Sequence, residues 1–462
     1  MPYILKKYYP TRNIIFFIGE AGLIFITLNL VYIFWDGFGP YLEDLYIYFL
    51  RAFVVTSVFQ LCLYYFDLYD LSVLPRFSEN AAQITLAFGF GCITLSFIYY
   101  LFPIFIISTK VFWSGYLTIC ICIALWRITY LLVLKHKMFT SPIALIGSGE
   151  LADKIASTIN TKKDSGYKIA SHSSQNSNKN GITDYSISSA YNRKVCNQMQ
   201  QLKIEKIVLA FDERRGVLPI QDLLACKLIG GIKVVDGVEF YEELTGKVMV
   251  EKINPSSILL SNGFQISFFI KFVKRVSDIF FSLFGLIIAS PIMFLSAVII
   301  KLESPGPILY MQKRVGLNGI IFSIIKFRSM VVEAEANGAV WASKTDSRVT
   351  RFGRLIRKLR IDEIPQMLNV LKGDMSFVGP RPERPIFVKR LEKNIPYYSL
   401  RHAVKPGITG WAQVFYPYGA SEEDALRKLE YDLYYIKNLS LGMDMWLIFQ
   451  TVKIVLFQRG SR

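Results

Sequence analysis

The segment that organises this chain reads Leu359-Arg360-Ile361-Asp362-Glu363-Ile364-Pro365-Gln366, and it is followed closely by Gly373-Asp374-Met375-Ser376-Phe377-Val378-Gly379-Pro380-Arg381-Pro382. Two adjacent acids stand inside a basic region here, since residues 344–405 contain 15 Lys or Arg and only 6 Asp or Glu. Such an excess of positive charge predicts a site for a polyanion. An acid pair in that site repels the polyanion unless a divalent cation bridges them, or unless one carboxylate is the reacting group.

The composition of the whole chain is that of a membrane protein. The chain has 462 residues and is too long for one domain. With 52% hydrophobic and 15% aromatic residues, it is also too apolar for a wholly soluble protein. The net charge of +17 suits nucleic acid, anionic lipid and phosphorylated substrates alike, so the location of the charges must decide between them. None of the six cysteines forms a CxxC pair or a zinc pattern, and we expect unpaired thiols.

Residues 1–137 are predicted to form a helical membrane bundle with four spans. Four apolar stretches each approach the ~20 residues that a helix needs to cross a bilayer. These stretches are Ile14–Phe34, Ala52–Phe66, Ala81–Leu101 and Val111–Leu134. Basic residues gather on one side of this arrangement, and three acids, at positions 36, 43 and 44, occupy the first loop on the other side. By the positive-inside rule, both ends of the bundle face the cytoplasm.

Residues 138–262 have the texture of a soluble α/β domain. A short β run at 143–146 leads into the turn Gly147-Ser148-Gly149-Glu150-Leu151-Ala152 and a helix, and further strands are predicted at 204–211 and 232–235. This pattern predicts a small Rossmann-like domain. Gly147 and Gly149 could bring a nucleotide phosphate to the helix N-terminus. A lone glycine turn is weak evidence, so the pattern favours a structural or regulatory domain over a nucleotide site.

Residues 263–462 begin with a fifth apolar stretch. Ile279–Ile300 is a run of 22 residues without charge, and Lys271 and Lys301 flank it with positive charges at both ends. Ser290-Pro291 interrupts its middle, where proline removes a backbone hydrogen bond and bends the helix. The flanking charges and this interruption favour a re-entrant helix over about residues 272–301, which enters and leaves on the cytoplasmic side.

The segments after this helix occur in a specific order. They include Ser304-Pro305-Gly306-Pro307, Gln312-Lys313-Arg314-Val315-Gly316, Lys326-Phe327-Arg328-Ser329-Met330, the two segments quoted above with Asn369-Val370-Leu371-Lys372, and Lys405-Pro406-Gly407-Ile408-Thr409-Gly410-Trp411-Ala412-Gln413-Val414. From about Lys271 onward, the chain resembles the bacterial sugar transferase family, the monotopic phosphoglycosyl transferases. With its spans and Rossmann-like domain, it resembles the large subclass, the exopolysaccharide polyprenyl glycosylphosphotransferases.

The resemblance implies a mainly α monotopic catalytic domain at the bacterial inner membrane, facing the cytoplasm. It implies transfer of a hexose-1-phosphate from a UDP-hexose to undecaprenyl phosphate with release of UMP, as the first step of exopolysaccharide synthesis. Asp362 matches the family's nucleophile, which forms a covalent phosphosugar intermediate. Glu363 would orient the nucleophile or the metal, and the expected cofactor is Mg²⁺ or Mn²⁺ held by Asp362 and Glu363. Membrane lipid is an expected partner and nucleic acid is not.

Basic residues around the acid pair are candidate ligands of the substrate. Arg381 stands between Pro380 and Pro382, whose stiff backbone suits a guanidinium aimed at a phosphate or a uracil edge; pairing with a local acid such as Glu383 is the alternative. Lys326 and Arg328 are predicted to bind phosphate as well. Arg357 belongs, with Arg351 and Arg354, to a basic helical face that borders the site, although a solvated face or a lipid-headgroup contact is nearly as well supported. Arg360, beside the acid pair, is a further candidate ligand of the substrate.

One segment departs from the family pattern. Many members carry a Gly-Arg-Asn type segment after Trp-Ala-Gln-Val, whereas Phe415-Tyr416-Pro417-Tyr418-Gly419-Ala420-Ser421 stands there in this chain. This replacement resembles the subgroup associated with exosortase-type loci. It leaves the identity of the hexose open, and the oligomeric state, including a homodimer, is open too.

Two other classes of function compete with the transferase. A membrane-anchored NAD-dependent nucleotide-sugar dehydratase or epimerase would use the glycine turn at Gly147, but it needs a Tyr-x-x-x-Lys pair that is not found after this turn. A scaffold or regulatory protein would need no reactive acid and predicts that Asp362 is dispensable.

Overall fold

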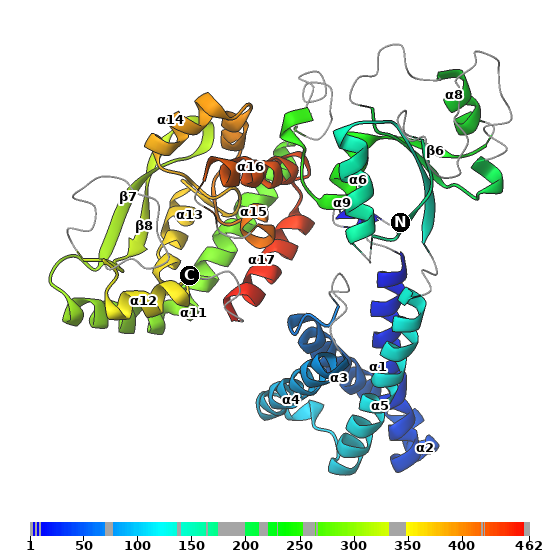
Figure 1. The fold of residues 1–462 in the computed structure, drawn as a ribbon. Coiled ribbons are helices and arrows are strands. Elements are labelled where there is room, and N and C mark those ends of the chain that lie inside the picture. Colours follow the sequence, from blue (N-terminus) through cyan, green and yellow to red (C-terminus); the bar gives the residue numbers. More distant parts are fainter. Residues whose placement is uncertain are drawn as a thin grey trace. The chain divides into compact units, whose positions relative to one another are not determined.

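A computed structural model describes residues 3–4, 7–8, 11–69, 77–135, 140–162, 165–173, 199–211, 220–228, 230–252, 264, 267–331, 348–416, 419 and 421–456. Apart from residues 1–7, where Tyr3–Ile4 and Lys7–Tyr8 pair as strands β1 and β2, the chain divides into two compact units. The first unit comprises residues 8–240 and the second comprises residues 241–462 (Figure 1).

The first unit begins with a helical bundle. Its elements are α1 (Thr11–Asp36), α2 (Phe38–Glu43), α3 (Leu45–Tyr65), α4 (Phe77–Leu101), the 3₁₀ turn η1 (Pro103–Phe105) and α5 (Thr109–Lys135). Each predicted apolar stretch coincides with one of the four long helices, apart from Phe66 just after the end of α3, and these helices are long and apolar enough to cross a membrane. Helix α3 starts before the predicted Ala52, because Arg51 is accommodated within it and donates to Ile104 O at 3.0 Å.

A buried ion pair connects the helices of the bundle. The fully buried carboxylate of Glu20 on α1 accepts hydrogen bonds from Arg127 Nε and Nη2 on α5, at 2.9 and 3.1 Å. Arg127 Nη1 also donates to Leu68 O, just after α3, at 2.9 Å. Three parts of the bundle therefore share one polar anchor, and the paired charges satisfy each other away from water.

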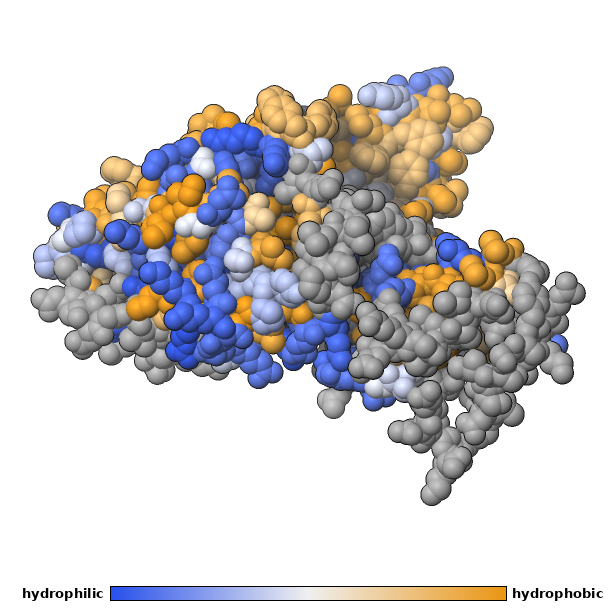
Figure 2. All heavy atoms as spheres, turned by 90° about the horizontal axis from the view of Figure 1, so that it is seen from above, coloured by the Kyte–Doolittle hydropathy of each residue, from blue (hydrophilic) through white to orange (hydrophobic). Residues whose placement is uncertain are grey.

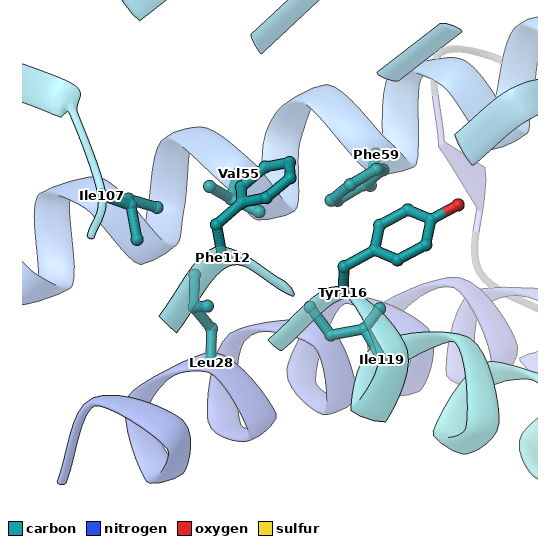
Figure 3. A pocket seen from close by; sticks show the side chains of 7 residues that line it. All are labelled: Leu28, Val55, Phe59, Ile107, Phe112, Tyr116 and Ile119. Carbon is teal, nitrogen blue, oxygen red and sulfur yellow. The ribbon is translucent and has the colours of Figure 1, made fainter. Parts of the chain in front are cut away.

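A small pocket in the bundle is lined almost entirely by carbon. Figure 3 shows the side chains around it, and the hydroxyl of Tyr116 is the one polar side-chain atom that they carry. The lining residues are Leu28, Val55, Phe59, Ile107, Phe112, Tyr116 and Ile119. This pocket has no charged group and offers no chemistry.

The first unit also contains a four-stranded parallel sheet, which confirms the predicted α/β texture. Its elements are β3 (Ser141–Ile146), α6 (Glu150–Thr161), β4 (Tyr167–Ser173), β5 (Lys206–Leu209), α8 (Ile220–Leu228), β6 (Lys233–Asp236) and the start of α9 (Gly237–Thr245), whose later residues belong to the second unit. The strand order is β4-β3-β5-β6, and every neighbouring pair is parallel. Strand β4 was not predicted, and its discovery makes β5 the third strand of the domain.

Close packing against Ala210 requires a glycine at Gly147, in the turn after β3. Gly147 adopts φ +143°, and a Cβ at this position would lie 2.1 Å from Ala210 O, so only glycine fits. Helix α6 then begins with Glu150, which pairs with Lys154 at 2.5 Å. An acid at a helix N-terminus occupies the position where a phosphate would otherwise gain from the helix dipole. These contacts favour a structural role for Gly147, while nucleotide binding at Gly149 stays a prediction.

The second unit carries the segments quoted from the sequence. Its elements are η2 (Val250–Lys252), α11 (Phe268–Glu303), β7 (Leu309–Val315), η4 (Leu317–Gly319), β8 (Ile321–Phe327), α12 (Arg351–Lys358), η5 (Ile361–Glu363), α13 (Gln366–Lys372), β9 (Ser376–Val378), α14 (Pro385–Asn394), η6 (Tyr398–Ala403), β10 (Gly407–Thr409), α15 (Trp411–Phe415), α16 (Glu422–Lys437) and α17 (Leu441–Leu456). Strands β7 and β8 form an antiparallel hairpin, and β9 pairs with β10 in parallel. Seen from above, the surface of this unit mixes extended hydrophilic areas with hydrophobic ones (Figure 2).

Helix α11 is a single helix of 36 residues that continues across Ser290-Pro291. The interruption predicted at these residues is therefore a bend within one helix, and Figure 1 shows that the two halves of α11 run in different directions. The first half is anchored through Asp278, which accepts from Ser376 Oγ at 3.0 Å. The second half is anchored through Ile300, which packs with Phe327 and Ile356. Both ends of the apolar helix thus return to the same unit.

The chain that leaves α9 is built into the second unit. Trp411 Nε1 donates to Gly246 O at 2.7 Å, and Val248 N donates to Glu430 O at 3.0 Å. The boundaries predicted at 137/138 and 262/263 lie outside the described residues, so they stay predictions; the compact units divide instead after Phe240.

Candidate active site

The acid pair lies on a short turn between two helices. Helix α12 ends at Lys358, and Arg360 adopts the left-handed conformation with φ 55° and ψ 20°, which non-glycine residues rarely do. This reversal starts the 3₁₀ turn η5 and directs the chain into α13. Asp362 and Glu363 are both buried by this arrangement, with 9% and 8% of their surface exposed.

Glu363 is surrounded by positive charge. Its Oε1 accepts from Arg381 Nη2 at 2.6 Å and from Lys326 Nζ at 3.1 Å, and Arg360 Nη1 lies 3.8 Å from Oε2. Burial alone would raise the pKa of Glu363, but Arg381 and Lys326 outweigh it and hold this pKa well below its usual range. Glu363 is therefore a stable anion that gathers the cations of the site.

Asp362 has the opposite environment. Among the described residues, none forms a hydrogen bond or an ion pair with its carboxylate. Burial and the negative charge of Glu363 raise the pKa of Asp362 to about 6, against the opposing effect of Lys326, Arg357 and Arg381. The structure thus leaves one carboxylate of the pair neutralised and the other available, with elevated basicity, next to three cationic side chains.

Asn369, which was not among the predicted site residues, fixes the strand that carries Lys326. Asn369 on α13 accepts from Ile325 N at 2.9 Å through Oδ1 and donates to Ser323 O at 2.8 Å through Nδ2. These two bonds attach the edge of β8 to α13, directly beside Lys326. Nothing in the sequence marks Asn369, which is buried in the structure, because the strand residues that it binds are distant in the chain.

Arg381 lies beside the acid pair, and its predicted contact with the substrate stays a prediction. Arg381 pairs with Glu363, and Glu383 lies 3.6 Å from Arg314 instead. The alternative ion pair between Arg381 and Glu383 therefore does not form. Glu363 outweighs the opposing effect of burial and raises the pKa of Arg381, which keeps this side chain charged. Of the two cations that bind Glu363, Arg381 is more exposed than Lys326. Its side chain is 38% accessible and can meet a ligand.

The guanidinium of Arg328 donates its hydrogen bonds to groups near the end of α11 and not to the acid pair. Its guanidinium is buried and donates to Pro305 O at 3.0 Å, to Ser304 O at 2.7 Å and to Ser304 Oγ at 2.8 Å, with a longer contact to Ile300 O at 3.4 Å. These bonds satisfy carbonyl groups at and just after the C-terminal end of α11. Such groups lack a donor because no further turn of the helix follows them. The bonds favour a structural role for Arg328 over the phosphate binding predicted from its sequence.

The carboxylates also define what metal the site could take. Within the part of the chain that the structure describes, no group of three or more His, Cys, Asp or Glu side chains could hold a metal ion. Mg²⁺ typically binds through one or two carboxylates together with substrate phosphates and water. Because Glu363 Oε1 is taken by Lys326 and Arg381, the two oxygens of Asp362 and Glu363 Oε2, which lies 3.8 Å from Arg360 Nη1, would be the ligands of a Mg²⁺ or Mn²⁺ ion that is shared with a phosphorylated substrate.

Comparison with known proteins gives a consistent family. The sequence model described as bacterial sugar transferase matches residues 269–458. The UDP-N-acetylgalactosamine-undecaprenyl-phosphate N-acetylgalactosaminephosphotransferase of Aeromonas hydrophila is 47% identical over 223 residues, which cover 48% of this chain and 52% of the relative. The undecaprenyl-phosphate glucose phosphotransferase of Komagataeibacter xylinus is 34% identical over 328 residues, which cover 69% and 60%.

A third relative is matched over nearly its whole length. The exopolysaccharide production protein PSS of Rhizobium leguminosarum bv. phaseoli is 42% identical over 187 residues, which cover 39% of this chain and 93% of the relative. The chain spans only 52% and 60% of the length of the first two relatives. All three alignments nevertheless agree with the family whose motifs surround Asp362 and Glu363, and this chain belongs to the bacterial sugar transferase family.

Proposed function

We propose that this protein transfers a sugar-1-phosphate from a UDP-sugar to undecaprenyl phosphate and releases UMP. The observation that carries the proposal is the difference between the two acids: Glu363 is bound by Arg381 and Lys326, whereas Asp362 is buried, basic and without a described partner. A nucleophilic carboxylate beside a cluster of cations is what attack on a pyrophosphate requires.

The reaction proceeds in two displacements at phosphorus. In the first, an oxygen of Asp362 forms a bond with the β-phosphorus of the UDP-sugar, and the bond from this phosphorus to the oxygen bridging the two phosphates breaks. UMP departs with that oxygen, and the sugar phosphate remains on Asp362 as an acyl phosphate. In the second, a phosphate oxygen of undecaprenyl phosphate attacks the same phosphorus and releases the Asp362 carboxylate, which gives the lipid diphosphate sugar.

The basic residues of the site hold the donor during these steps. We assign Arg381 and Lys326 to the pyrophosphate oxygens, and Arg360 and Arg357 add positive charge near the acid pair. Glu363 keeps Arg381 and Lys326 in position and maintains the basicity of Asp362. A Mg²⁺ or Mn²⁺ ion bound at Asp362 and Glu363 Oε2 would neutralise charge on the phosphates.

The membrane places both substrates at one surface. Four helices, α1, α3, α4 and α5, cross the bacterial inner membrane, and α11 enters and leaves it on the cytoplasmic side. The acid pair then lies at the cytoplasmic surface, where a soluble UDP-sugar and a lipid phosphate can both arrive. Packing of both ends of α11 on one unit supports this arrangement. The parallel sheet of the first unit serves as a Rossmann-like structural or regulatory domain.

The sugar is proposed only as a hexose. The relatives are named for N-acetylgalactosamine in one case and glucose in another, so similarity does not choose between them. The name of a third, an exopolysaccharide production protein, supports a role at the start of exopolysaccharide synthesis. The dehydratase or epimerase alternative gains no support, because the family match at residues 269–458 lies outside the glycine turn at Gly147.

The test replaces the nucleophile. Purified Asp362→Asn protein is mixed with UDP-sugars and undecaprenyl phosphate in detergent or nanodiscs, and UMP release is measured. We expect loss of at least about 10³-fold, because the amide cannot form the acyl phosphate. Glu422→Gln is the matched control, since Glu422 pairs with Arg390 at the surface and should leave the rate unchanged. Undiminished turnover by Asp362→Asn would refute the mechanism, and mass spectrometry of the wild type with donor alone should find the phosphosugar adduct.

A further inference from the structure

The segment that carries Arg381 cannot be held by ordinary strand pairing. Pro380 and Pro382 lack a backbone N–H, so the segment contributes successive carbonyl acceptors and few donors of its own. Proline rings restrict φ, but they do not fix where the segment lies relative to the rest of the unit. Donors from elsewhere in the fold must therefore determine the position of Arg381.

Each of three successive carbonyls receives such a donor. Pro380 O accepts from the backbone N–H of Gly407 at 2.9 Å. Arg381 O accepts from Arg401 Nη2 at 2.9 Å, and Pro382 O accepts from Arg314 Nη1 at 3.1 Å. Two arginine side chains from different elements thus bind neighbouring carbonyls of the segment. They take the place of a strand partner.

The two arginines are themselves fixed. Arg401 is 7% exposed, pairs with Asp432 Oδ2 at 2.9 Å and donates to the hydroxyl of Tyr398. Asp432 is buried on α16, so the pair anchors the segment to the core of the unit. Arg314 donates to Gln312 Oε1 at 2.6 Å and lies 3.6 Å from Glu383. A lysine could not reproduce these contacts, because one ammonium cannot span the positions that the guanidinium fork reaches.

We propose that Arg401 and Arg314 are positioning residues, which hold Arg381 in the orientation that pairs it with Glu363. This inference rests on the proposed function. Among the described contacts, neither arginine bonds to Asp362 or Glu363, and both act through the backbone of Arg381 and Pro382. Displacement of that backbone would lengthen the 2.6 Å contact between Arg381 and Glu363 and move the cation that meets the pyrophosphate.

The test is a double-mutant cycle on UMP release. Arg401→Gln and Arg401→Lys are made alone and in combination with Arg381→Ala. Alone, we expect Arg401→Gln to lower kcat/KM about 100-fold, with Arg401→Lys recovering only part of the loss. In the Arg381→Ala background, the same substitutions should cost less than about 3-fold, because the residue through which they act is gone. Equal losses in both backgrounds would show a general structural role and overturn the proposal.

A second pair of variants guards against misfolding. Arg314→Lys should show the same dependence on Arg381 and carries the cycle if Arg401→Gln does not fold. Lys437→Met is the control. Lys437 lies on the same helix as Asp432, and the substitution removes its ion pair with Glu242 without touching the segment. Its loss should be small and equal in both backgrounds. If the wild type releases no UMP, the proposed function fails; if it does and the cycle is additive, only the positioning role fails.

Discussion

Asp362 and Glu363 are neighbours in the chain, yet their surroundings give them opposite acidities. Arg381 and Lys326 both bind one oxygen of Glu363, whereas no described residue binds Asp362. Burial and, after it, the charge of Glu363 raise the pKa of Asp362, and Lys326 opposes them. Because attack needs the ionised carboxylate, the rate should fall as the pH drops through about 6, where Asp362 becomes protonated.

Two substitutions should move this pH dependence in opposite directions. Glu363→Gln removes the negative neighbour, lowers the pKa of Asp362 and shifts the acid limb of kcat/KM by about 1 unit to lower pH. Lys326→Met removes a cation, raises the pKa of Asp362 and shifts the limb to higher pH. The measurement is UMP release between pH 4.5 and 8, with an assay range chosen around the pKa of about 6.

Both variants will also lose rate, since both residues contact the donor site, so the position of the limb is the informative quantity. Arg328→Met serves as the control, because its guanidinium bonds to carbonyls at the end of α11 and should leave the limb where it is. Shifts in the same direction for Glu363→Gln and Lys326→Met would contradict the electrostatic coupling described here.

At the scale of elements, local patterns predicted more than long-range contacts did. The apolar runs predicted the long helices, because hydrophobic length is a local property. Strand β4 was missed because Tyr167-Lys168-Ile169-Ala170-Ser171-His172-Ser173 has few apolar residues, and its pairing with β3 supplies the strand structure. The acid pair and Arg381 were identified from their segments, but Asn369, Arg401 and Arg314 act on distant backbone and have no local signature.

Arg328 illustrates the same limit and gives a prediction about α11. Its sequence neighbour Lys326 suggested phosphate binding, but on the hairpin the side chains two residues apart end in different surroundings, one at Glu363 and the other at the end of α11. Arg328→Met should destabilise the second unit by roughly 2–4 kcal/mol, because several carbonyls lose their donor. The donor KM of the folded fraction should stay unchanged.

The contrast with Lys326→Met makes this prediction specific. Lys326→Met should raise the donor KM with a smaller effect on the thermal unfolding midpoint, because Lys326 contacts the acid pair and no helix end. Thermal unfolding in detergent and initial rates over a range of UDP-sugar concentrations provide both quantities. A raised KM for Arg328→Met without loss of stability would restore the phosphate-binding role.

For the whole molecule, the arrangement of α11 decides where the chemistry occurs. A straight helix of 36 residues would be about 54 Å long and would exceed the hydrocarbon core of about 30 Å. Its two ends would then lie on opposite faces of the membrane. The structure instead anchors Lys274 to Asp444 at one end and packs Ile300 on Ile356 at the other, within one unit. One globular unit cannot contact both ends from opposite faces.

We therefore expect both ends of α11 to face the cytoplasm. Single cysteines placed at positions 271 and 301, in a background without the six native cysteines, should be labelled from the same face by a membrane-impermeant maleimide in oriented vesicles. A cysteine at position 39, in the loop predicted to lie outside, provides the reference for the opposite face. Labelling of 271 and 301 from different faces would make α11 a full span and would separate Asp362 from the cytoplasmic UDP-sugar, so both the topology and the proposed reaction would then fail together.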